Sequence, residues 1–199
     1  MRGSGDHVHP TGRRDLKPTR GPIETRSLLL APRAVVWERV TSAQGINDEL
    51  RPLFRMTAPR RLREEGLAKV QIGRRICRSW VLRFGVLPVD YDDITLVRLE
   101  APAGFLERSR MLSQRTWEHE RTLEEAPGGC VLSDRVTYAP RLPVPDLLLR
   151  ALYARVFAHR HRRLQRRFGG HALAATTGRR AGASRESRRS DPPVRARAD

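Results

Sequence analysis

Residues 117–121 of the chain read Trp-Glu-His-Glu-Arg, and residues 134–140 read Asp-Arg-Val-Thr-Tyr-Ala-Pro. In both stretches the side chains that could face the protein interior recur at every second residue, and this two-residue period is typical of a half-buried β-strand. Between them, residues 125–129 read Glu-Ala-Pro-Gly-Gly, a sequence typical of a tight turn. The pattern therefore predicts an antiparallel hairpin of strands 116–123 and 131–138.

The position of the turn also predicts how the two strands pair. If the hairpin closes at Ala126 and Pro127, His119 lies opposite Asp134. Their Cβ atoms would then be about 4.5–5.5 Å apart, close enough for the side chains to share a hydrogen bond. We favour a satisfied polar pair within the sheet, with ligand orientation or acid–base catalysis as the alternatives. The alternation places these side chains on one face: Trp117, His119, Arg121, Leu132, Asp134, Val136 and Tyr138.

Upstream of this hairpin the chain reads as a strand, short helices and further strands. Pro32 suits the first turn of a helix over 34–41, and a second short helix is expected over 46–50. The remaining strand-like segments are 23–30, 69–72, 76–84, 93–100 and 105–113.

The last predicted element is a long helix from Asp146 to Phe168. Asp146 favours the positive end of a helix, and Gly169-Gly170 provides a stop. A helix over this range is about 35 Å long, enough to cross a small sheet. The order of elements predicts an α+β protein in which a curved antiparallel sheet of six to seven strands wraps around the C-terminal helix. Such an arrangement leaves a cavity between sheet and helix.

The formal net charge of the 199-residue chain is +17, which invites a nucleic-acid interpretation. Its distribution weakens that interpretation, because the segments 1–22, 146–170 and 171–199 carry +3, +6 and +4. Residues 23–145 carry only +4, so the charge lies mainly at the periphery. All but two of the 39 basic residues are arginine, which also forms structural ion pairs.

Composition divides the chain into one domain over 22–170 and two tails. Residues 1–21 and 171–199 have few large apolar side chains, so we predict a disordered basic tail and a disordered Arg-rich tail. Neither Cys77 nor Cys130 has nearby Cys or His residues, and no segment has the length and apolarity of a membrane span or signal peptide. These features favour a cytoplasmic protein.

No sequence template for catalysis or cofactor binding is found, so we predict no cofactor and no metal. Asp90, Asp92 and Asp93 resemble half of a calcium loop, but the glycine and the distal glutamate of that motif are missing. Four carboxylates could act as general acid or base if they face the cavity: Glu107, Glu118, Glu120 and Asp134.

Four stretches together resemble the SRPBCC superfamily, also called START-like or helix-grip proteins, in its ligand-binding or polyketide-cyclase-like branch. They are Pro32–Trp37, Trp117-x-His119-x-Arg121, the residues Asp134, Val136, Tyr138 and Pro140, and Phe157-x-x-Arg160-x-x-x-Leu164. The resemblance covers about residues 23–170. It implies a helix-grip fold, with a curved sheet gripping the C-terminal helix around an apolar cavity.

We therefore expect the domain to bind an apolar or aromatic small molecule, lipid- or polyketide-like, without catalysing a reaction. A polyketide cyclase or dehydratase that uses the same cavity is the alternative. The expected ligand-binding residues are Trp80, Phe84, Met111, Trp117, His119, Asp134, Tyr138, Tyr153 and Phe157.

A third interpretation concerns the basic end of the long helix. It would bind nucleic acid or an anionic membrane surface, assisted by the C-terminal tail. The alternative is a solvated helix end whose cations interact favourably with the helix dipole. The candidate anion-binding residues are Arg160, Arg162, Arg163, Arg166 and Arg167. The sequence leaves the oligomeric state open.

Overall fold

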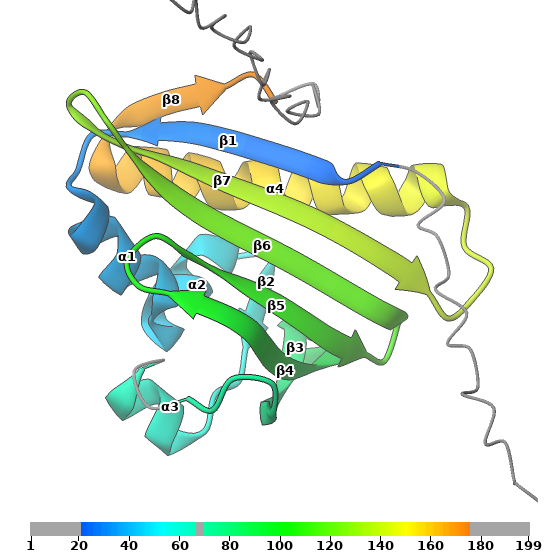
Figure 1. Ribbon diagram of the computed structural model, residues 1–199. Helices are drawn as coiled ribbons and strands as arrows, with labels where there is room; N and C mark the ends of the chain where they lie inside the picture. Colours follow the sequence, from blue (N-terminus) through cyan, green and yellow to red (C-terminus); the bar gives the residue numbers. More distant parts are fainter. Residues whose placement is uncertain (1–20, 67–69, 176–199) are drawn as a thin grey trace, which may run out of the picture.

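The computed structural model describes residues 21–66 and 70–175. These residues form one antiparallel sheet with strand order β2-β3-β4-β5-β6-β7-β1-β8, together with four helices (Figure 1). The strands are β1 (Ile23–Leu29), β2 (Phe54–Met56), β3 (Arg75–Arg83), β4 (Leu87–Glu100), β5 (Gly104–Met111), β6 (Gln114–Ala126), β7 (Gly129–Pro140) and β8 (Gly170–Leu173). The helices are α1 (Arg33–Thr41), α2 (Ala43–Leu50), α3 (Arg60–Glu65) and α4 (Asp146–Phe168). The predicted α+β helix-grip architecture is confirmed, with eight strands instead of six to seven.

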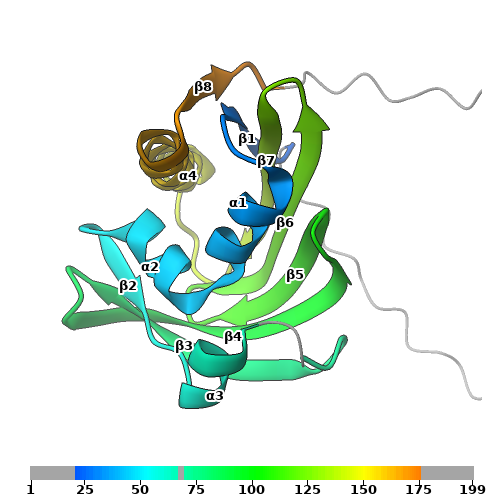
Figure 2. The ribbon, with the colours of Figure 1, turned by 90° about the vertical axis from the view of Figure 1, so that its left-hand side faces the viewer.

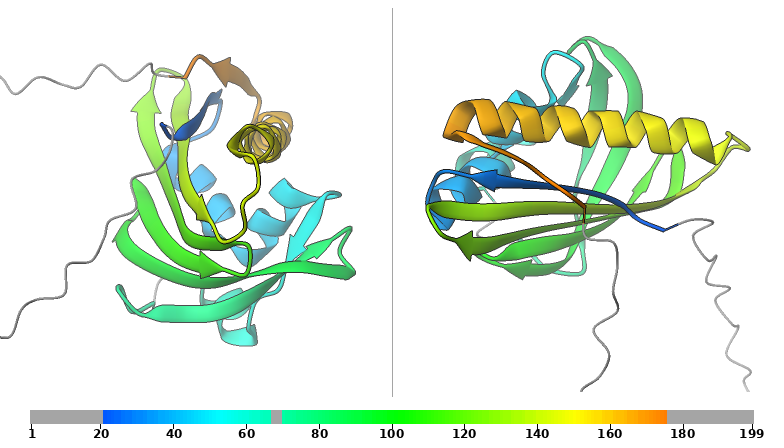
Figure 3. Two further views of the ribbon diagram at one scale, coloured as in Figure 1. Left: turned by 90° about the vertical axis from the view of Figure 1, so that its right-hand side faces the viewer. Right: turned by 90° about the horizontal axis from the view of Figure 1, so that it is seen from above.

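The sheet curves around α4, which lies across its concave side (Figures 2 and 3). Figure 2 looks along α4 and shows α1 and α2 inside the same curve. Two groups of buried apolar side chains fill the space between these layers. One joins α1, the β6–β7 turn region and the end of α4 through Val36, Leu123 and Leu164. The other joins the opposite end of the sheet to α4 through Trp117, Val136 and Phe157.

The β6–β7 hairpin pairs two residues away from the predicted register. Ala126 pairs with Gly129, so Pro127 and Gly128 form the two-residue turn, and Gly128 has a positive φ of 78°. As a result His119 lies opposite Val136, and Arg121 lies opposite Asp134. A shift of two residues preserves the side-chain alternation. The predicted inner face of this hairpin is therefore confirmed, although its predicted pairing is wrong.

Three elements were not predicted: β2, α3 and β8. The short strand β2 is held on one side by β3 and on the other by Asn47 of α2. The Asn47 side chain accepts a hydrogen bond from the backbone N–H of Met56 and donates one to its carbonyl oxygen. The strand predicted at 69–72 is absent from the described residues 70–72.

The C-terminal boundary of the domain also differs from the prediction. The chain does not leave the domain at residue 171, because Gly170–Leu173 forms β8 and pairs with β1. Gly170 permits this return with a φ of 113°, and a Cβ there would lie 2.0 Å from the carbonyl oxygen of Leu28. The predicted tails otherwise fall on 1–20 and 176–199, which lie outside the described residues.

Candidate functional site

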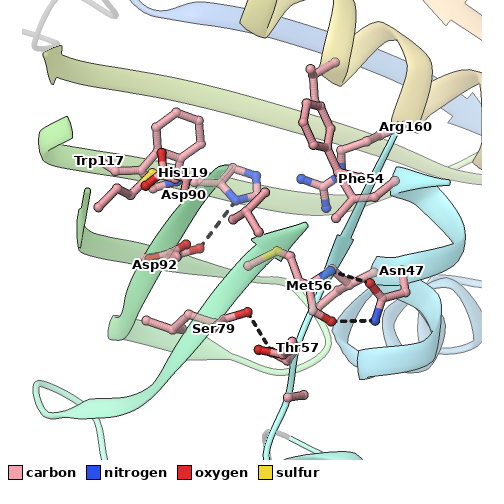
Figure 4. Close-up of a pocket in the computed structure, with 18 of the residues that line it drawn as sticks. Asn47, Phe54, Met56, Thr57, Ser79, Asp90, Asp92, Trp117, His119 and Arg160 are labelled. Atoms are coloured by element: carbon pink, nitrogen blue, oxygen red, sulfur yellow. Dashed lines mark hydrogen bonds and ion pairs between the residues drawn. The ribbon is translucent and has the colours of Figure 1, made fainter. Parts of the chain in front are cut away.

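A cavity of about 380 Å³ lies between the curved sheet, α2 and α4 (Figure 4). This volume is within the range that accommodates small organic ligands. Val89 of β4 and Leu152 of α4 line the cavity and are also 43% and 45% exposed, so its opening lies between these two elements. Most of the wall is apolar. The apolar lining includes Val40, Ile46, Leu50, Phe54, Met56, Leu62, Val81, Ile94, Leu96, Phe105, Leu149 and Val156.

Five of the nine expected ligand-binding residues line this cavity: Met111, Trp117, His119, Tyr153 and Phe157. Two others lie behind its wall. Asp134 is buried under His119, and Tyr138 packs against Tyr153 and donates a hydrogen bond to Asp146 at 2.8 Å. These two residues support the lining residues and do not face the cavity.

Trp80 and Phe84 were predicted to face the cavity, and this placement is wrong. In β3 the cavity is lined by Ser79 and Val81, so the side-chain alternation directs Trp80 to the outer face. There Trp80 is 45% exposed and packs edge-on against Tyr91. Phe84 lies in the turn after β3 with a φ of 51° and is 63% exposed. The aromatic character of these two residues was therefore not enough to predict whether their side chains face the cavity or the outer surface.

The polar part of the cavity wall centres on Asp92, Glu107 and His119. Asp92 belongs to β4, Glu107 to β5 and His119 to β6, so three adjacent strands bring them together. His119 Nδ1 lies 3.8 Å from Glu107 Oε2, and Ser109 donates a hydrogen bond to Glu107 at 2.7 Å. The imidazole is also held edge-on by the rings of Phe105 and Phe157. His119 therefore presents a fixed nitrogen to the acidic part of the wall.

Asp92 differs from its neighbours because it is buried, at 4% exposure, without a cationic partner among the described residues. Burial, followed by the nearby charge of Glu107, raises the pKa of Asp92 well above its usual range. One of its carboxyl oxygens, Oδ1, has no hydrogen-bond partner. The neutral, protonated form of this side chain is consequently favoured in the folded protein.

Behind His119 lies a buried ion-pair network centred on Arg121. The Arg121 guanidinium donates two hydrogen bonds of 2.7 Å to Asp134 and two more, of 3.1 and 3.2 Å, to Glu49 of α2. Glu49 also accepts a hydrogen bond from Arg160 of α4 at 2.9 Å. Two guanidinium groups thus offset two carboxylates, and the network ties α2 and α4 to the sheet.

Asp134 is the most heavily bonded carboxylate of this network. In addition to Arg121, it accepts hydrogen bonds from Nε2 of His119 at 2.9 Å and Nε2 of His161 at 3.0 Å. Burial acts to raise the pKa of Asp134, but the Arg121 charge and hydrogen bonds outweigh it and hold this pKa well below its usual range. The predicted His119–Asp134 hydrogen bond is present. It runs diagonally, since the two residues are not directly opposite each other.

A second polar region of the cavity wall lies near the β5–β6 turn. Asp90 accepts hydrogen bonds from the backbone N–H groups of Leu112 and Ser113, which fixes this turn. Next to it, Gln114 donates a hydrogen bond to the Tyr153 hydroxyl at 2.9 Å, whereas its own Oε1 is buried without a partner. Burial raises the pKa of Tyr153 to about 12, so its hydroxyl is neutral at physiological pH.

The arginines at the end of α4 do not form a single group. Arg160 is 9% exposed, lines the cavity and is neutralised by Glu49. Arg163 donates a hydrogen bond to the carbonyl oxygen of Asp48, while Arg162 and Arg166 are exposed. Arg167 is exposed and lies over the ring of Phe168. Only part of the expected basic site is therefore available to an external anion.

Sequence reasoning missed Asp92 and Glu49 as parts of the site. Asp92 was considered only as part of an incomplete calcium loop, although the spacing Asp90, Asp92, Ile94 and Leu96 follows the period of one strand face. This two-residue period was the sequence signal that could have placed Asp92 on the inner face of the strand. Of the other carboxylates considered, Glu107 faces the cavity, whereas Glu118 and Glu120 pair with arginines on the outer face. No local signal marks Glu49, since its partners come from β6 and α4.

In the described part of the chain, no group of three His, Cys, Asp or Glu side chains is arranged to hold a metal ion. The same residues include no helix that combines the length and apolarity needed to span a membrane.

The curved sheet, the C-terminal helix and the cavity between them define a START-like helix-grip fold. The chain belongs to the family described as domain of unknown function DUF8410, whose model matches residues 27–168. No curated protein matches it in sequence.

Solved structures share the fold at low sequence identity. Protein CV1439 of Chromobacterium violaceum is 14% identical with a TM-score of 0.60, over 75% of this chain and 99% of that one. A START superfamily protein of Mycobacterium smegmatis is 10% identical with a TM-score of 0.56, over 75% and 97%. DynU16, a putative protein of the dynemicin biosynthetic locus, is 16% identical with a TM-score of 0.50, over 74% and 46%. The SRPBCC resemblance is thus confirmed at the level of the fold.

Proposed function

We propose that this protein binds an apolar or aromatic small molecule in the cavity between the sheet and α4. The observation that carries this proposal is the cavity itself, which keeps about 380 Å³ open inside a protein of this size. Protein interiors are otherwise packed nearly without voids, so a space of this size, lined by aliphatic and aromatic side chains, suits a ligand. The similarity to a START superfamily protein and to a protein of a biosynthetic locus supports small-molecule binding as a class.

We propose binding without catalysis. His119 is held by Asp134 and by two aromatic rings, and Arg160 is neutralised by Glu49. These side chains are fixed as parts of the wall. A cyclase or dehydratase remains the alternative because Asp92, Glu107 and His119 place titratable groups on the cavity. Mass analysis distinguishes the two, since a carrier returns its ligand unchanged whereas an enzyme alters the mass of a polyketide-like substrate.

Uptake of the neutral apolar dye Nile red tests the proposal. The unmodified protein is expected to bind the dye with increased fluorescence, and Val81→Trp, which fills the cavity from β3, is expected to reduce the affinity at least tenfold. Arg78→Trp adds the same side chain to an exposed position on the outer face of β3, outside the cavity, and is expected to bind like the unmodified protein. Thermal unfolding of both variants verifies that they are folded. Equal dye binding by all three proteins would contradict a cavity site.

A further inference from the structure

The unpartnered polar atoms of the cavity wall restrict what the ligand can be. Two buried side-chain oxygens on this wall have no hydrogen-bond partner: Asp92 Oδ1 and Gln114 Oε1. Asp92 and Gln114 are only 4% and 1% exposed. An unsatisfied buried polar atom is costly, and both of these atoms are acceptors when Asp92 is ionised. A ligand that satisfies them must therefore supply hydrogen-bond donors.

The charges around the cavity favour a cationic donor. Three carboxylates are buried in the described part of the chain. Glu49 is paired with two arginines, and Asp134 is bonded to one arginine and two histidines. Asp92 is the third and has no cation among the described residues, while its neighbour Glu107 adds a further negative charge. Protonation of Asp92 keeps this part of the wall from carrying a second negative charge, and the ionised form of Asp92 would need a cation that the described residues do not supply.

We propose, as an extension of the proposed function, that the ligand carries a protonated amine on an apolar body and that the amine binds Asp92. The amine would donate hydrogen bonds to the unpartnered Asp92 oxygen and bring the missing charge to the Asp92–Glu107 pair. The apolar body would lie against the aromatic side chains of Trp117 and Phe157, which line the same cavity. Such a pair is desolvated, so its charge-assisted hydrogen bonds are stronger than those between neutral groups.

A matched pair of probes tests this assignment: 1-naphthylmethylamine and 1-naphthalenemethanol, which share an apolar body and differ in the charge of the polar end. The unmodified protein is expected to bind the amine at least tenfold more tightly than the alcohol, as measured by calorimetric titration at pH 7. Asp92→Asn is expected to reduce that preference to less than threefold. Asp93→Asn changes the adjacent outer-face carboxylate, which pairs with Arg78, and is expected to keep the full preference.

Equal affinity for the two probes, or a preference that persists in Asp92→Asn, would overturn the amine assignment. Failure of both probes to bind would also overturn it if the same sample takes up Nile red, and the proposed apolar cavity site would then stand. If Nile red does not bind either, the proposed function itself fails.

Discussion

The guanidinium of Arg121 and the carboxylate of Asp134 face each other across the β6–β7 pair and are joined by two hydrogen bonds of 2.7 Å. Both side chains have no measurable exposure to solvent. Because Arg121 also binds Glu49, a single side chain offsets charges from two other elements. A buried ion pair is not by itself strongly stabilising, but the loss of one partner leaves uncompensated charge in the interior.

Arg121→Met is therefore expected to lower the free energy of unfolding by about 3–5 kcal/mol, because Asp134 and Glu49 lose their central cation. Urea unfolding followed by circular dichroism measures the change. The control is Arg108→Ala, which removes an exposed arginine of β5 that pairs with Glu118 of β6, and is expected to cost at most about 1 kcal/mol. If the two variants lost similar stability, the buried network would not have the role assigned to it.

Asp92→Asn is expected to stabilise the protein without ligand, and increasingly so as the pH rises. The folded-state pKa of Asp92 is raised, so the contribution of this group to stability is fully present below its unfolded pKa and is lost as the pH rises toward the folded value. Asparagine does not ionise, so the variant does not lose this stability as the pH rises. The advantage of the variant is expected to be small at pH 4 and to grow by up to about 1.4 kcal/mol per pH unit until the folded pKa is passed. Urea unfolding between pH 4 and pH 8 tests this, and a constant difference would contradict it.

Gly129→Ala is expected to destabilise the sheet where β7 begins beside β1. A Cβ at this position would lie 1.9 Å from the carbonyl oxygen of Leu29, so the backbone of one strand must move. We expect a loss of about 1–3 kcal/mol, typical of a substitution that overfills a packed site. Gly21→Ala is the control, since a Cβ there has nothing within 4 Å, and its unfolding free energy should change by less than about 0.5 kcal/mol.

The contribution of residues 176–199 to nucleic-acid binding can be tested by truncation after Ala175, which keeps β8 intact. The removed segment carries a formal charge of +4. If the segment binds DNA, its removal is expected to make the slope of log affinity against log salt concentration shallower by up to about 4–6 units. The exact change depends on how many phosphate groups the segment contacts. Fluorescence anisotropy with a DNA duplex, at salt concentrations from about 50 to 200 mM, measures the slope. An unchanged slope would exclude the segment from DNA binding.

Local sequence patterns were sufficient to predict the long helix, the β6–β7 hairpin and the face that it buries. The helix has a clear start at Asp146 and a clear stop at Gly169, and the hairpin has a turn between two alternating strands. The register could not be predicted, since a shift of two residues leaves the inner face unchanged. The strand β2 is too short to show a period, and the Asn47 amide that borders it comes from α2.

The site itself was predicted only in part. Residues such as Trp117, Tyr153 and Phe157 were identified because large aromatic side chains on an inner face lie beside a cavity or a core. The ion-pair network was not, because Glu49, Arg121 and Arg160 come together only when α2, β6 and α4 have packed. Arg160 illustrates the difference, since its position in a basic run predicts an external anion whereas its actual partner is an internal carboxylate.

The double attachment of Glu49 also bears on how a ligand enters and leaves. For α2 to swing away from the cavity, Glu49 would have to part from Arg121 in the sheet and from Arg160 in α4, exposing or stranding buried charges. The helix is therefore a fixed wall, and exchange must use the opening beside Val89 and Leu152. Side-chain rotations at that opening are far faster than helix displacement. The affinity of a bound molecule is thus set by its contacts in the cavity, whereas changes at the opening should alter the association and dissociation rates together and leave the affinity unchanged.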